Sequence, residues 1–421
     1  MKLQYFIWLS AVAAILPSCG TKGTTGNEGS ITVDVAAAIE NPQELKASML
    51  GSKIRFVPLE TSDSSLLTDS WRAVAFGDRI IIANVAAISF GGHGGNSAMM
   101  FDLNTGKFLT LVGKEGSGPG EYSSPLPEVN AEGNTIYFVA GNRNGWETYG
   151  TDGKYKEKVL PEVSTNSHVL ISVKDSIALV ERYDLAGSER RKVYERYALS
   201  GNLLDSLVMF EGQEGMSRNL TFGSNPEMYT HNTPLRSTLI EFVDDGKSTM
   251  FPGGRVWKTG DEFHLKEEYC DTIYKLEPGN GEKAVMIFDA GEHRFPFEKI
   301  NKEMIGDDNI IITDVLETPS KVIFSVSHGW IGKEGHKENI CLYDRKTGET
   351  VTTEAGNKFS DDLSGFMPFV PNMITSDGKL IGYLTMEEIE EWMEDNPDAE
   401  RPTWLNGRKT DDNPVLVIVE E

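Results

Sequence analysis

Histidine is the residue type of this chain best suited to bind a transition metal or to transfer protons near neutral pH. The sequence has seven histidines, and no two of them stand in the His-Glu-x-x-His spacing that places a zinc-binding pair on one helix face. We therefore expect no metal and no cofactor, although histidines from different repeats of a ring-shaped fold could still meet. The full set is His93, His168, His231, His264, His293, His328 and His336.

Other catalytic signatures are incomplete. The glycine-rich segment around His93 lacks the lysine and the serine or threonine of a phosphate loop. The DLNTGK segment with Asp102 and Asn104 is too short for a calcium loop and lacks its distal glutamate, so we expect a hairpin there. No Gly-x-Ser-x-Gly turn occurs. The sequence therefore identifies no catalytic residue.

Two tryptophans and a histidine in glycine-containing segments are candidates for ligand binding. Trp146 lies in GNRNGWETYG, and His328 and Trp330 lie in SHGWIGKEGH. Aromatic faces beside polar groups suit sugars and peptides, because they give contact area at a small entropic cost. The alternative is that each tryptophan packs between sheets.

The charge balance excludes one class of partner. With 40 basic and 64 acidic residues the net charge is -24, which repels the phosphates of nucleic acids. Nucleic acid is therefore not expected as a partner. No sequence pattern indicates an oligomeric state.

The N-terminus predicts an export signal. An apolar run from Tyr5 to Leu16 follows Lys2 and is too short for a permanent membrane span. It leads into Leu-Pro-Ser-Cys, which resembles a bacterial lipobox and implies that residues 1–18 form a lipoprotein signal peptide and that Cys19 carries the lipid. The alternative is an ordinary cleaved signal with an incidental cysteine. Gly20 beside the cysteine resembles lipoproteins of the outer membrane, and the lack of a dense acidic cluster in the following GTKGTTGNEGS tether favours the periplasmic side.

The stretch from Gly113 to Pro127, GKEGSGPGEYSSPLP, is too rich in glycine and proline for helix or regular strand. A β-like run precedes it (108–112) and another follows it (134–140). We therefore predict an ordered crossing between two sheets, as between consecutive blades of a β-propeller.

A repeated pattern supports this architecture. An aromatic residue followed by a glycine hairpin recurs, with positions 101, 149 and 197 each 48 residues apart, and a period of about 40 to 50 residues is typical of propeller blades. A β-branched run accompanies each unit. The hairpins begin at Phe101, Tyr149, Tyr197, Tyr274 and Tyr343, and the runs begin at Asp78, Asn134, Asp175, Ser237, Ser320 and Gly378.

Six runs predict an all-β fold, a six-bladed β-propeller of four-stranded antiparallel blades. We expect the signal peptide at 1–18, a flexible tether and N-terminal segment at 19–50, and the propeller at 51–421. Residues 30–50 are weakly helical in pattern. The strand-like run Ile54 to Glu60 could pair with Pro414 to Val419 and close the ring, with Pro58 at an edge or an end.

The last repeat contains a short acidic helical insertion. Thr385 and Glu388 have capping-box form, and Ile389, Trp392 and Met393 fall on one helical face. Residues 387–400 include eight acidic residues and no basic residue. The helix either packs Trp392 on the blade edge or docks a partner.

Four segments together resemble a known family: GKEGSGPGEYSSP, IRFVPLETSDSSLL, CDTIYKL and NPVLVIV. The family is that of the six-bladed β-propeller lipoproteins of bacterial envelopes, which have NHL-like blades and no assigned general activity. The likeness covers roughly residues 54–421. Cys270 before DTIY and the acidic helix depart from the pattern. The resemblance implies the fold and an envelope location, and it transfers no catalytic residue.

These observations favour a lipid-anchored, non-enzymatic binding or scaffold module for a glycan, peptide or envelope protein. The alternative is a periplasmic hydrolase, lyase or lactonase with carboxylates and a divalent metal in the central channel. A structural assembly subunit is a third reading. Cys270 and Cys341 could form a disulfide or remain buried thiols.

Overall fold

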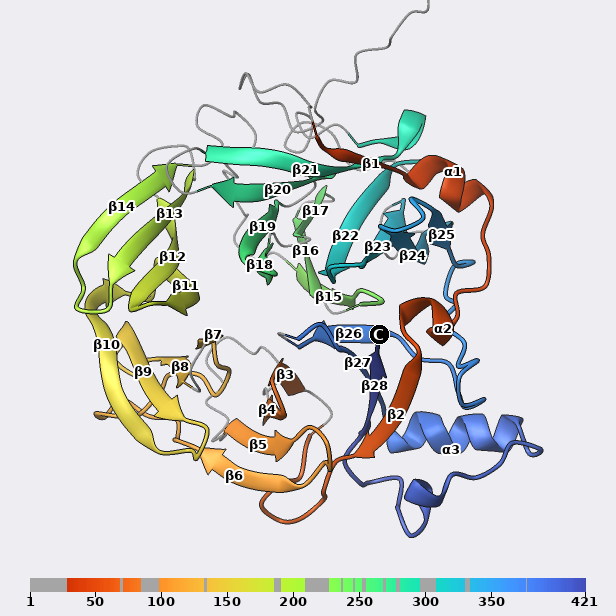
Figure 1. The fold of residues 1–421 in the computed structure, drawn as a ribbon, viewed down its shortest axis with the longest axis horizontal. Helices are drawn as coiled ribbons and strands as arrows, with labels where there is room; N and C mark the ends of the chain where they lie inside the picture. Colours follow the sequence, from red (N-terminus) through yellow and green to blue (C-terminus); the bar gives the residue numbers. More distant parts are fainter. Residues whose placement is uncertain are drawn as a thin grey trace, which may run out of the picture.

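A computed structural model of the chain shows a ring of small β-sheets around a central axis (Figure 1). The structure describes residues 29–68, 71–84, 98–131, 135–184, 191–208, 227–235, 238–244, 247–251, 255–267, 270–277, 281–295, 308–329, 334–375 and 377–421. The signal peptide 1–18, Cys19, His93 and Trp330 lie outside these ranges.

The predicted six-bladed β-propeller is confirmed, and its blades are antiparallel sheets. Blade 1 contains β3 (Trp71–Phe76), β4 (Arg79–Asn84), β5 (Ala98–Asp102) and β6 (Phe108–Val112). Blade 2 contains β7 (Val129–Ala131), β8 (Thr135–Val139), β9 (Asn144–Gly150) and β10 (Tyr155–Ser164). Blade 3 contains β11 (His168–Lys174), β12 (Ile177–Asp184), β13 (Arg191–Ala198) and β14 (Leu203–Val208).

The second half of the ring follows the same order. Blade 4 contains β18 (Arg255–Thr259), β19 (Glu262–Lys266), β20 (Thr272–Glu277) and β21 (Gly281–Asp289). Blade 5 contains β22 (Ile310–Glu317), β23 (Lys321–His328), β24 (Lys337–Asp344) and β25 (Thr350–Thr352). Blade 6 contains β26 (Pro371–Ile374), β27 (Leu380–Leu384), β28 (Val415–Glu420) and β2 (Lys53–Pro58).

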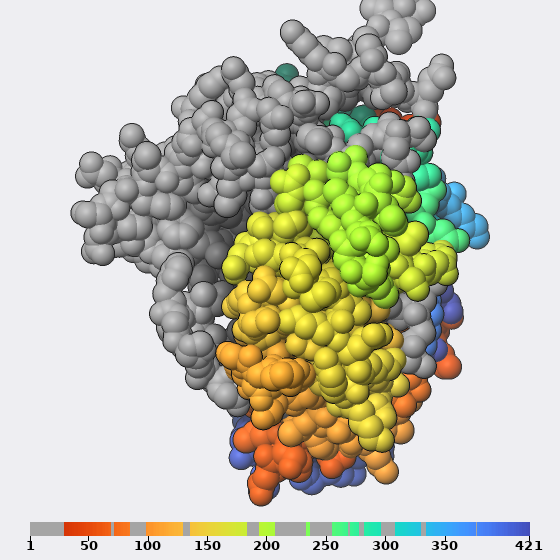
Figure 2. All heavy atoms as spheres, turned by 90° about the vertical axis from the view of Figure 1, so that its left-hand side faces the viewer, coloured from red at the N-terminus to blue at the C-terminus, as the bar shows by residue number. Residues whose placement is uncertain are grey.

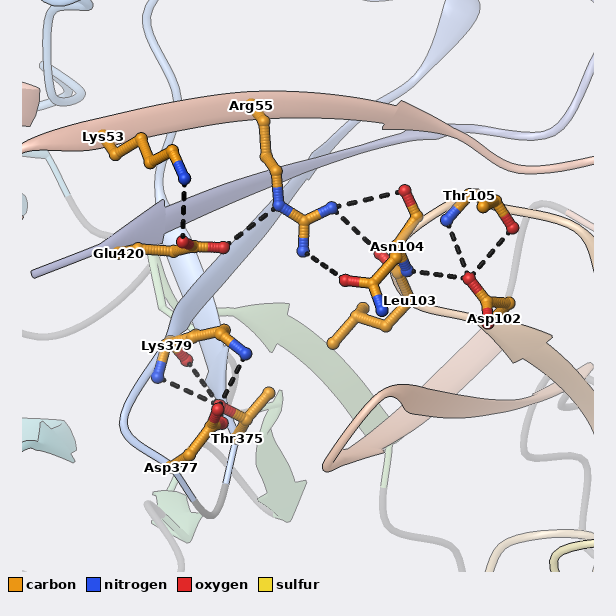
Figure 3. A network of polar contacts seen from close by, with 10 residues as sticks. All are labelled: Lys53, Arg55, Asp102, Leu103, Asn104, Thr105, Thr375, Asp377, Lys379 and Glu420. Carbon is orange, nitrogen blue, oxygen red and sulfur yellow. Dashed lines mark hydrogen bonds and ion pairs between the residues drawn. The ribbon is translucent and has the colours of Figure 1, made fainter.

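The predicted ring closure is confirmed. Strand β2 pairs antiparallel with β28, from Lys53 opposite Glu420 to Pro58 opposite Val415, so the N-terminal strand becomes the outer edge of the last blade. Arg55 then reaches the first blade (Figure 3): its Nε donates to Glu420 at 3.1 Å, and its Nη1 donates to the Leu103 carbonyl at 3.3 Å. Main-chain pairing and one guanidinium therefore join the two ends of the ring.

The predicted glycine hairpins connect the third and fourth strands of blades 1 to 5. In DLNTGK, Asp102 Oδ1 accepts the N–H groups of Asn104 at 3.0 Å and Thr105 at 2.9 Å. Gly106 has φ +71°, and a Cβ there would lie 2.0 Å from the Pro58 carbonyl oxygen. Only glycine therefore fits where this hairpin meets β2, and the segment is a hairpin as expected.

The glycine- and proline-rich crossing between blades 1 and 2 is ordered around Tyr122, whose side chain is fully buried. Its ring stacks on Phe138 with centroids 4.6 Å apart, and its hydroxyl donates to the Val112 carbonyl at 3.0 Å. Figure 2 shows the outer surface of the next two blades, 2 and 3, in yellow and green, packed side by side. Apolar contacts of this kind between neighbouring blades form the core.

One predicted run belongs to a different sheet. The β-branched run from Ser237 forms β16 (Thr238–Asp244), which pairs with β15 (Glu227–Asn232) and β17 (Lys247–Phe251) in a separate three-stranded sheet. The second strand of blade 4 is β19 instead. This inserted sheet explains the long interval between the hairpins at 197 and 274, and the buried Leu235 joins it to the core of blades 5 and 6.

Residues 31–50 run along the outside of three blades as a strap (Figure 1). Strand β1 (Ile31–Asp34) adds to blade 4 in parallel to β21. Helix α1 (Val35–Glu40) follows, and α2 (Ala47–Leu50) buries its ends in the core of blades 5 and 6 before β2 begins. The weak helical pattern of residues 30–50 corresponds to the two short helices α1 and α2. The expected start of the propeller at residue 51 comes directly after them.

The predicted helix in the last blade is present as α3 (Met386–Asp395), between β27 and β28, and its capping box between Thr385 and Glu388 forms. Ile389 is fully buried, and the Trp392 ring lies 5.1 Å from that of Phe366. The helix therefore packs on the blade with its apolar face. The described part of the chain also contains two short 3-10 helices, η1 (Gly291–His293) and η3 (Thr403–Leu405).

Candidate functional site

The alternation of strand direction gives the ring two different faces. Turns between first and second strands and hairpins between third and fourth strands lie on one face, which we call the hairpin face. The opposite face, the connection face, carries the segments that join blades and the loops between second and third strands. Each candidate residue can therefore be assigned to the hairpin face or to the connection face.

Trp146 is fully buried between blades 2 and 3. Its indole Nε1 donates to Glu128 Oε2 at 2.5 Å, and the same oxygen accepts the Leu170 N–H at 3.0 Å. Burial raises the pKa of Glu128, and these two hydrogen bonds only partly offset it. Trp146 thus packs between sheets, the alternative noted above, and its ring faces are not open to a sugar.

A second tryptophan–carboxylate contact lies between blades 4 and 5 and was not expected from the sequence. Glu317, at the end of β22, has a side chain that is 0% exposed. Its Oε2 accepts from Trp257 Nε1 at 2.8 Å, from Thr259 Oγ1 at 3.2 Å and faces His264 Nδ1 at 2.7 Å. Arg345 donates to Oε1. Burial acts to raise the pKa of Glu317, but the hydrogen bonds and charges of its neighbours outweigh it and lower that pKa.

Blade 3 contains a further buried carboxylate with several donors. Glu195 accepts from Arg182 Nε at 2.7 Å and from the Tyr197 hydroxyl at 2.7 Å, and His168 Nε2 lies 3.6 Å from it. In the same sheet Tyr194 donates to Glu181 at 2.9 Å. These contacts hold neighbouring strands together, so the carboxylates have a structural explanation.

Cys270 and Cys341 do not form a disulfide with each other, because Cys341 is a free thiol. It is fully buried, and its Sγ lies 2.8 Å from Thr352 Oγ1. Burial raises the pKa of Cys341 to about 12, which makes it unreactive.

His328 lies at the connection face, at the end of β23. Its ring is close to that of His293, with centroids 5.9 Å apart. Burial lowers the pKa of His328, and the charges of His293 and Lys337 lower it further. Of the two candidates within the described ranges, Trp146 and His328, it is His328 that is partly accessible, and it lies next to a second histidine.

A hollow of about 500 Å³ opens at the hairpin face between blades 5 and 6. We call it the serine hollow. Four parts of the chain line it: the end of the strap, the turn between β22 and β23, the segment between β25 and β26, and the end of β28. Its residues are Ser48, Gly51, Ser52, Ser320, Lys321, Leu363 and Glu421.

Two further features are absent from the described ranges. No group of three or more histidine, cysteine, aspartate or glutamate side chains there is arranged to hold a metal ion. Among the same residues, no helix has the length and apolar character needed to cross a bilayer.

The family follows from the sequence match along the chain. A family model described as "Domain of unknown function (DUF4934)" matches residues 30–420, which includes the strap and all six blades. The chain belongs to the DUF4934 family. No curated protein matches it.

Several solved structures are similar to this DUF4934 protein at low sequence identity. A Bacteroides fragilis protein described as a "Putative exported protein" has a TM-score of 0.57 and 15% identity, over 93% of this chain and 99% of that one. The β-propeller domain of the Trilobed protease from Pyrococcus furiosus has a TM-score of 0.33 and 11% identity, over 77% and 90% of the two chains. Pyrococcus horikoshii acylaminoacyl peptidase has a TM-score of 0.36 and 12% identity, over 81% and 50%.

The features that sequence reasoning missed in this DUF4934 chain are all built from distant residues. Glu317 is 60 positions from Trp257 and 53 from His264. The serine hollow combines residues near position 50 with residues near 320 and 421. The one usable signal was the predicted pairing of the two chain ends, which brings the strap beside the C-terminal strand.

Proposed function

We propose that this DUF4934 protein is a lipid-anchored, non-enzymatic binding module of the bacterial envelope, and that the serine hollow is its ligand site. The observation that carries the proposal is the hollow itself, formed by four remote segments on a closed ring. Its volume of about 500 Å³ lies within the range of small-molecule sites.

The lining indicates the chemistry of the ligand. Ser48, Ser52 and Ser320 offer hydroxyls that can both donate and accept, and Leu363 offers an apolar patch. A sugar has the same combination of hydroxyl groups and apolar C–H faces. Hydroxyl-rich walls therefore favour a sugar unit of a glycan over an apolar ligand.

The charges of the hollow disfavour an anionic ligand. Lys321 is the cation in the lining, and its Nζ already lies 3.8 Å from Asp344 and 3.4 Å from Ser320 Oγ. Glu421 accepts a hydrogen bond from Ser320, and Asp362 accepts one from Ser48 at 2.6 Å. Three carboxylates around one lysine repel an anionic ligand.

Binding is tested with a defined panel of neutral mono- and disaccharides, measured by saturation-transfer NMR on the full mature chain. Ser52 is exposed and only its main-chain N–H is engaged, with the Glu420 carbonyl at 2.9 Å, so Ser52→Trp fills the hollow without removing a side-chain contact. Ser200→Trp, at an exposed hairpin position of blade 3, is the matched control. We expect at least one sugar to bind the wild type and Ser200→Trp and to lose binding in Ser52→Trp. A panel with no binder, or equal binding by Ser52→Trp, contradicts the proposal.

The envelope location is the second part of the proposal. The LPSC tetrapeptide supports lipid attachment at Cys19 and residues 1–18 as the signal peptide, and the similar B. fragilis structure is described as exported. The proposed position is the periplasmic side of the outer membrane, and the likeness to envelope lipoproteins with NHL-like blades belongs to the same proposal. Metabolic labelling with an alkyne fatty acid should mark the wild type and not Cys19→Ser, which should leave the membrane fraction. Equal labelling of both proteins contradicts it.

A further inference from the structure

Two histidines from consecutive parts of the ring face each other at the connection face. His293 ends η1, in the segment that joins blade 4 to blade 5, and His328 ends β23 of blade 5. Their ring centroids are 5.9 Å apart, and the planes are inclined by 61°. His293 is exposed and His328 is partly exposed, so solvent ions can reach the pair.

One hydrogen bond fixes the tautomer of the His293 ring. Its Nδ1 lies 3.0 Å from the carbonyl oxygen of Asp308, which can only accept, so Nδ1 carries the proton. In the neutral ring Nε2 then has a free lone pair. A backbone carbonyl that orients the second nitrogen in this way is the usual arrangement around histidines that bind metal ions.

The spacing of the rings suits a shared ion. With metal–nitrogen distances of ~2.0 to 2.1 Å and tetrahedral angles, two imidazoles on one ion have centroids ~5 Å apart. The observed 5.9 Å exceeds this by less than about 1 Å, which a small change in side-chain torsion can supply.

The local charges also suit a cation. Imidazole binds a metal ion in its neutral form, so binding is favoured above the ordinary histidine pKa of about 6.5. The charge of Asp308 acts to raise the pKa of His328, which places that carboxylate where it can offset the charge of a bound ion. Lys337 lies opposite His328 in the β23–β24 pairing and is the nearby group that opposes binding.

We propose that His293 and His328 together bind one divalent transition-metal ion of the zinc and copper class, with water in the remaining positions. Neutral imidazoles prefer such ions to calcium or magnesium. The bound ion would connect the blade 4 to blade 5 segment with β23 and so stabilise this junction of the ring. This inference does not depend on the serine hollow.

Titration of the dialysed, full mature chain with Zn²⁺ by calorimetry tests the proposal, together with Cu²⁺ electron paramagnetic resonance. We expect one ion per chain, a copper spectrum with two nitrogen ligands, and affinity at least tenfold lower in His293→Gln and in His328→Gln. His336→Gln is the control, because His336 Nε2 is engaged by Ser327 Oγ at 3.1 Å. It should bind like the wild type.

A stability measurement separates lost ligands from lost folding. Zn²⁺ should raise the unfolding temperature of the wild type and of His336→Gln, should not raise that of His293→Gln or His328→Gln, and EDTA should reverse the effect. All four proteins should unfold at similar temperatures without metal. The proposal is overturned if both variants bind Zn²⁺ as tightly as the wild type, or if the wild type binds it only at millimolar concentration.

Discussion

The two buried tryptophan–carboxylate contacts, Trp146 with Glu128 and Trp257 with Glu317, look alike and differ in charge balance. Both lie between neighbouring blades, and in both an indole N–H donates to a carboxylate oxygen, at 2.5 Å and 2.8 Å. Glu128 accepts a main-chain N–H as its second hydrogen bond, whereas Glu317 also contacts Arg345 and His264. One interface uses neutral donors, and the other adds the guanidinium cation of Arg345.

The pKa values of the two carboxyl groups move in opposite directions as a result. Burial raises the pKa of Glu128, and the distant charge of Arg143 is too weak to restore it. Glu317 is also buried, yet the contacts with His264, Trp257 and Arg345 lower its pKa. The comparison teaches that the indole alone does not compensate a buried carboxylate, and that a cation in contact does.

We expect the largest loss of stability from a substitution at the Glu317 interface. Glu317→Gln keeps the shape of the side chain but removes its charge, which leaves Arg345 and His264 without their shared partner. We expect a loss of about 3 kcal/mol in the free energy of unfolding. Urea unfolding at pH 7 measures it, with Glu128→Gln as the matched variant. A loss of less than about 1 kcal/mol would show that Arg345 does not depend on Glu317.

Arg345→Met makes the Glu317 interface resemble the Glu128 interface, because it removes the cation and keeps the aliphatic chain. We expect a loss of about 2 kcal/mol and an upward shift of the Glu317 pKa. Lys346→Met, at the exposed neighbouring position of the same turn, controls for general loss of charge and should change stability by less than about 0.5 kcal/mol. Equal effects of the two variants would argue against a specific role of Arg345.

Replacing each tryptophan with phenylalanine compares the two indole hydrogen bonds. Trp146→Phe leaves Glu128 with the Leu170 N–H, whereas Trp257→Phe leaves Glu317 with three other donors. Trp146 is also more deeply buried. We therefore expect losses of about 2 kcal/mol and about 1 kcal/mol respectively. Thermal unfolding of the two variants decides this order, and the reverse order would contradict the charge argument.

Glu128→Gln should have the smallest effect. The glutamine oxygen can accept the same two N–H groups, and the substitution removes a charge that burial disfavours. We expect stability within about 1 kcal/mol of the wild type at pH 7, with a small gain on electrostatic grounds. A loss as large as that of Glu317→Gln, measured in the same urea series, would remove the distinction between the interfaces.

Much of the fold could be predicted because blades are local structures. Glycine hairpins after Phe101 or Tyr343, and the pairing of Ile54 to Glu60 with the C-terminal run, depend on nearby residues or on the known closure of propellers. The run from Ser237 was assigned to the wrong sheet, because a β-branched run predicts a strand but not its neighbours.

The candidate site was much less predictable. Trp146 and His328 were noticed for their loop composition, but their partners Glu128 and His293 lie in other strands or segments. Glu317 has no local signature, because its donors come from β18, β19 and the turn after β24. Such contacts depend on how blades pack, which residue spacing does not specify.

The most direct test of this account is the unfolding free energy of wild type, Glu317→Gln and Glu128→Gln as a function of pH. Because the pKa of Glu317 is lowered by folding, its carboxylate stabilises the fold above the ordinary glutamate pKa of about 4.3, and this contribution is lost as the pH falls toward the lowered value. Because the pKa of Glu128 is raised by folding, the wild type instead loses stability as the pH rises from about 4.3 through the raised value. The account predicts that, with rising pH, Glu317→Gln falls further behind the wild type while Glu128→Gln gains on it. Parallel changes in the two variants, or no pH dependence in either, would contradict it.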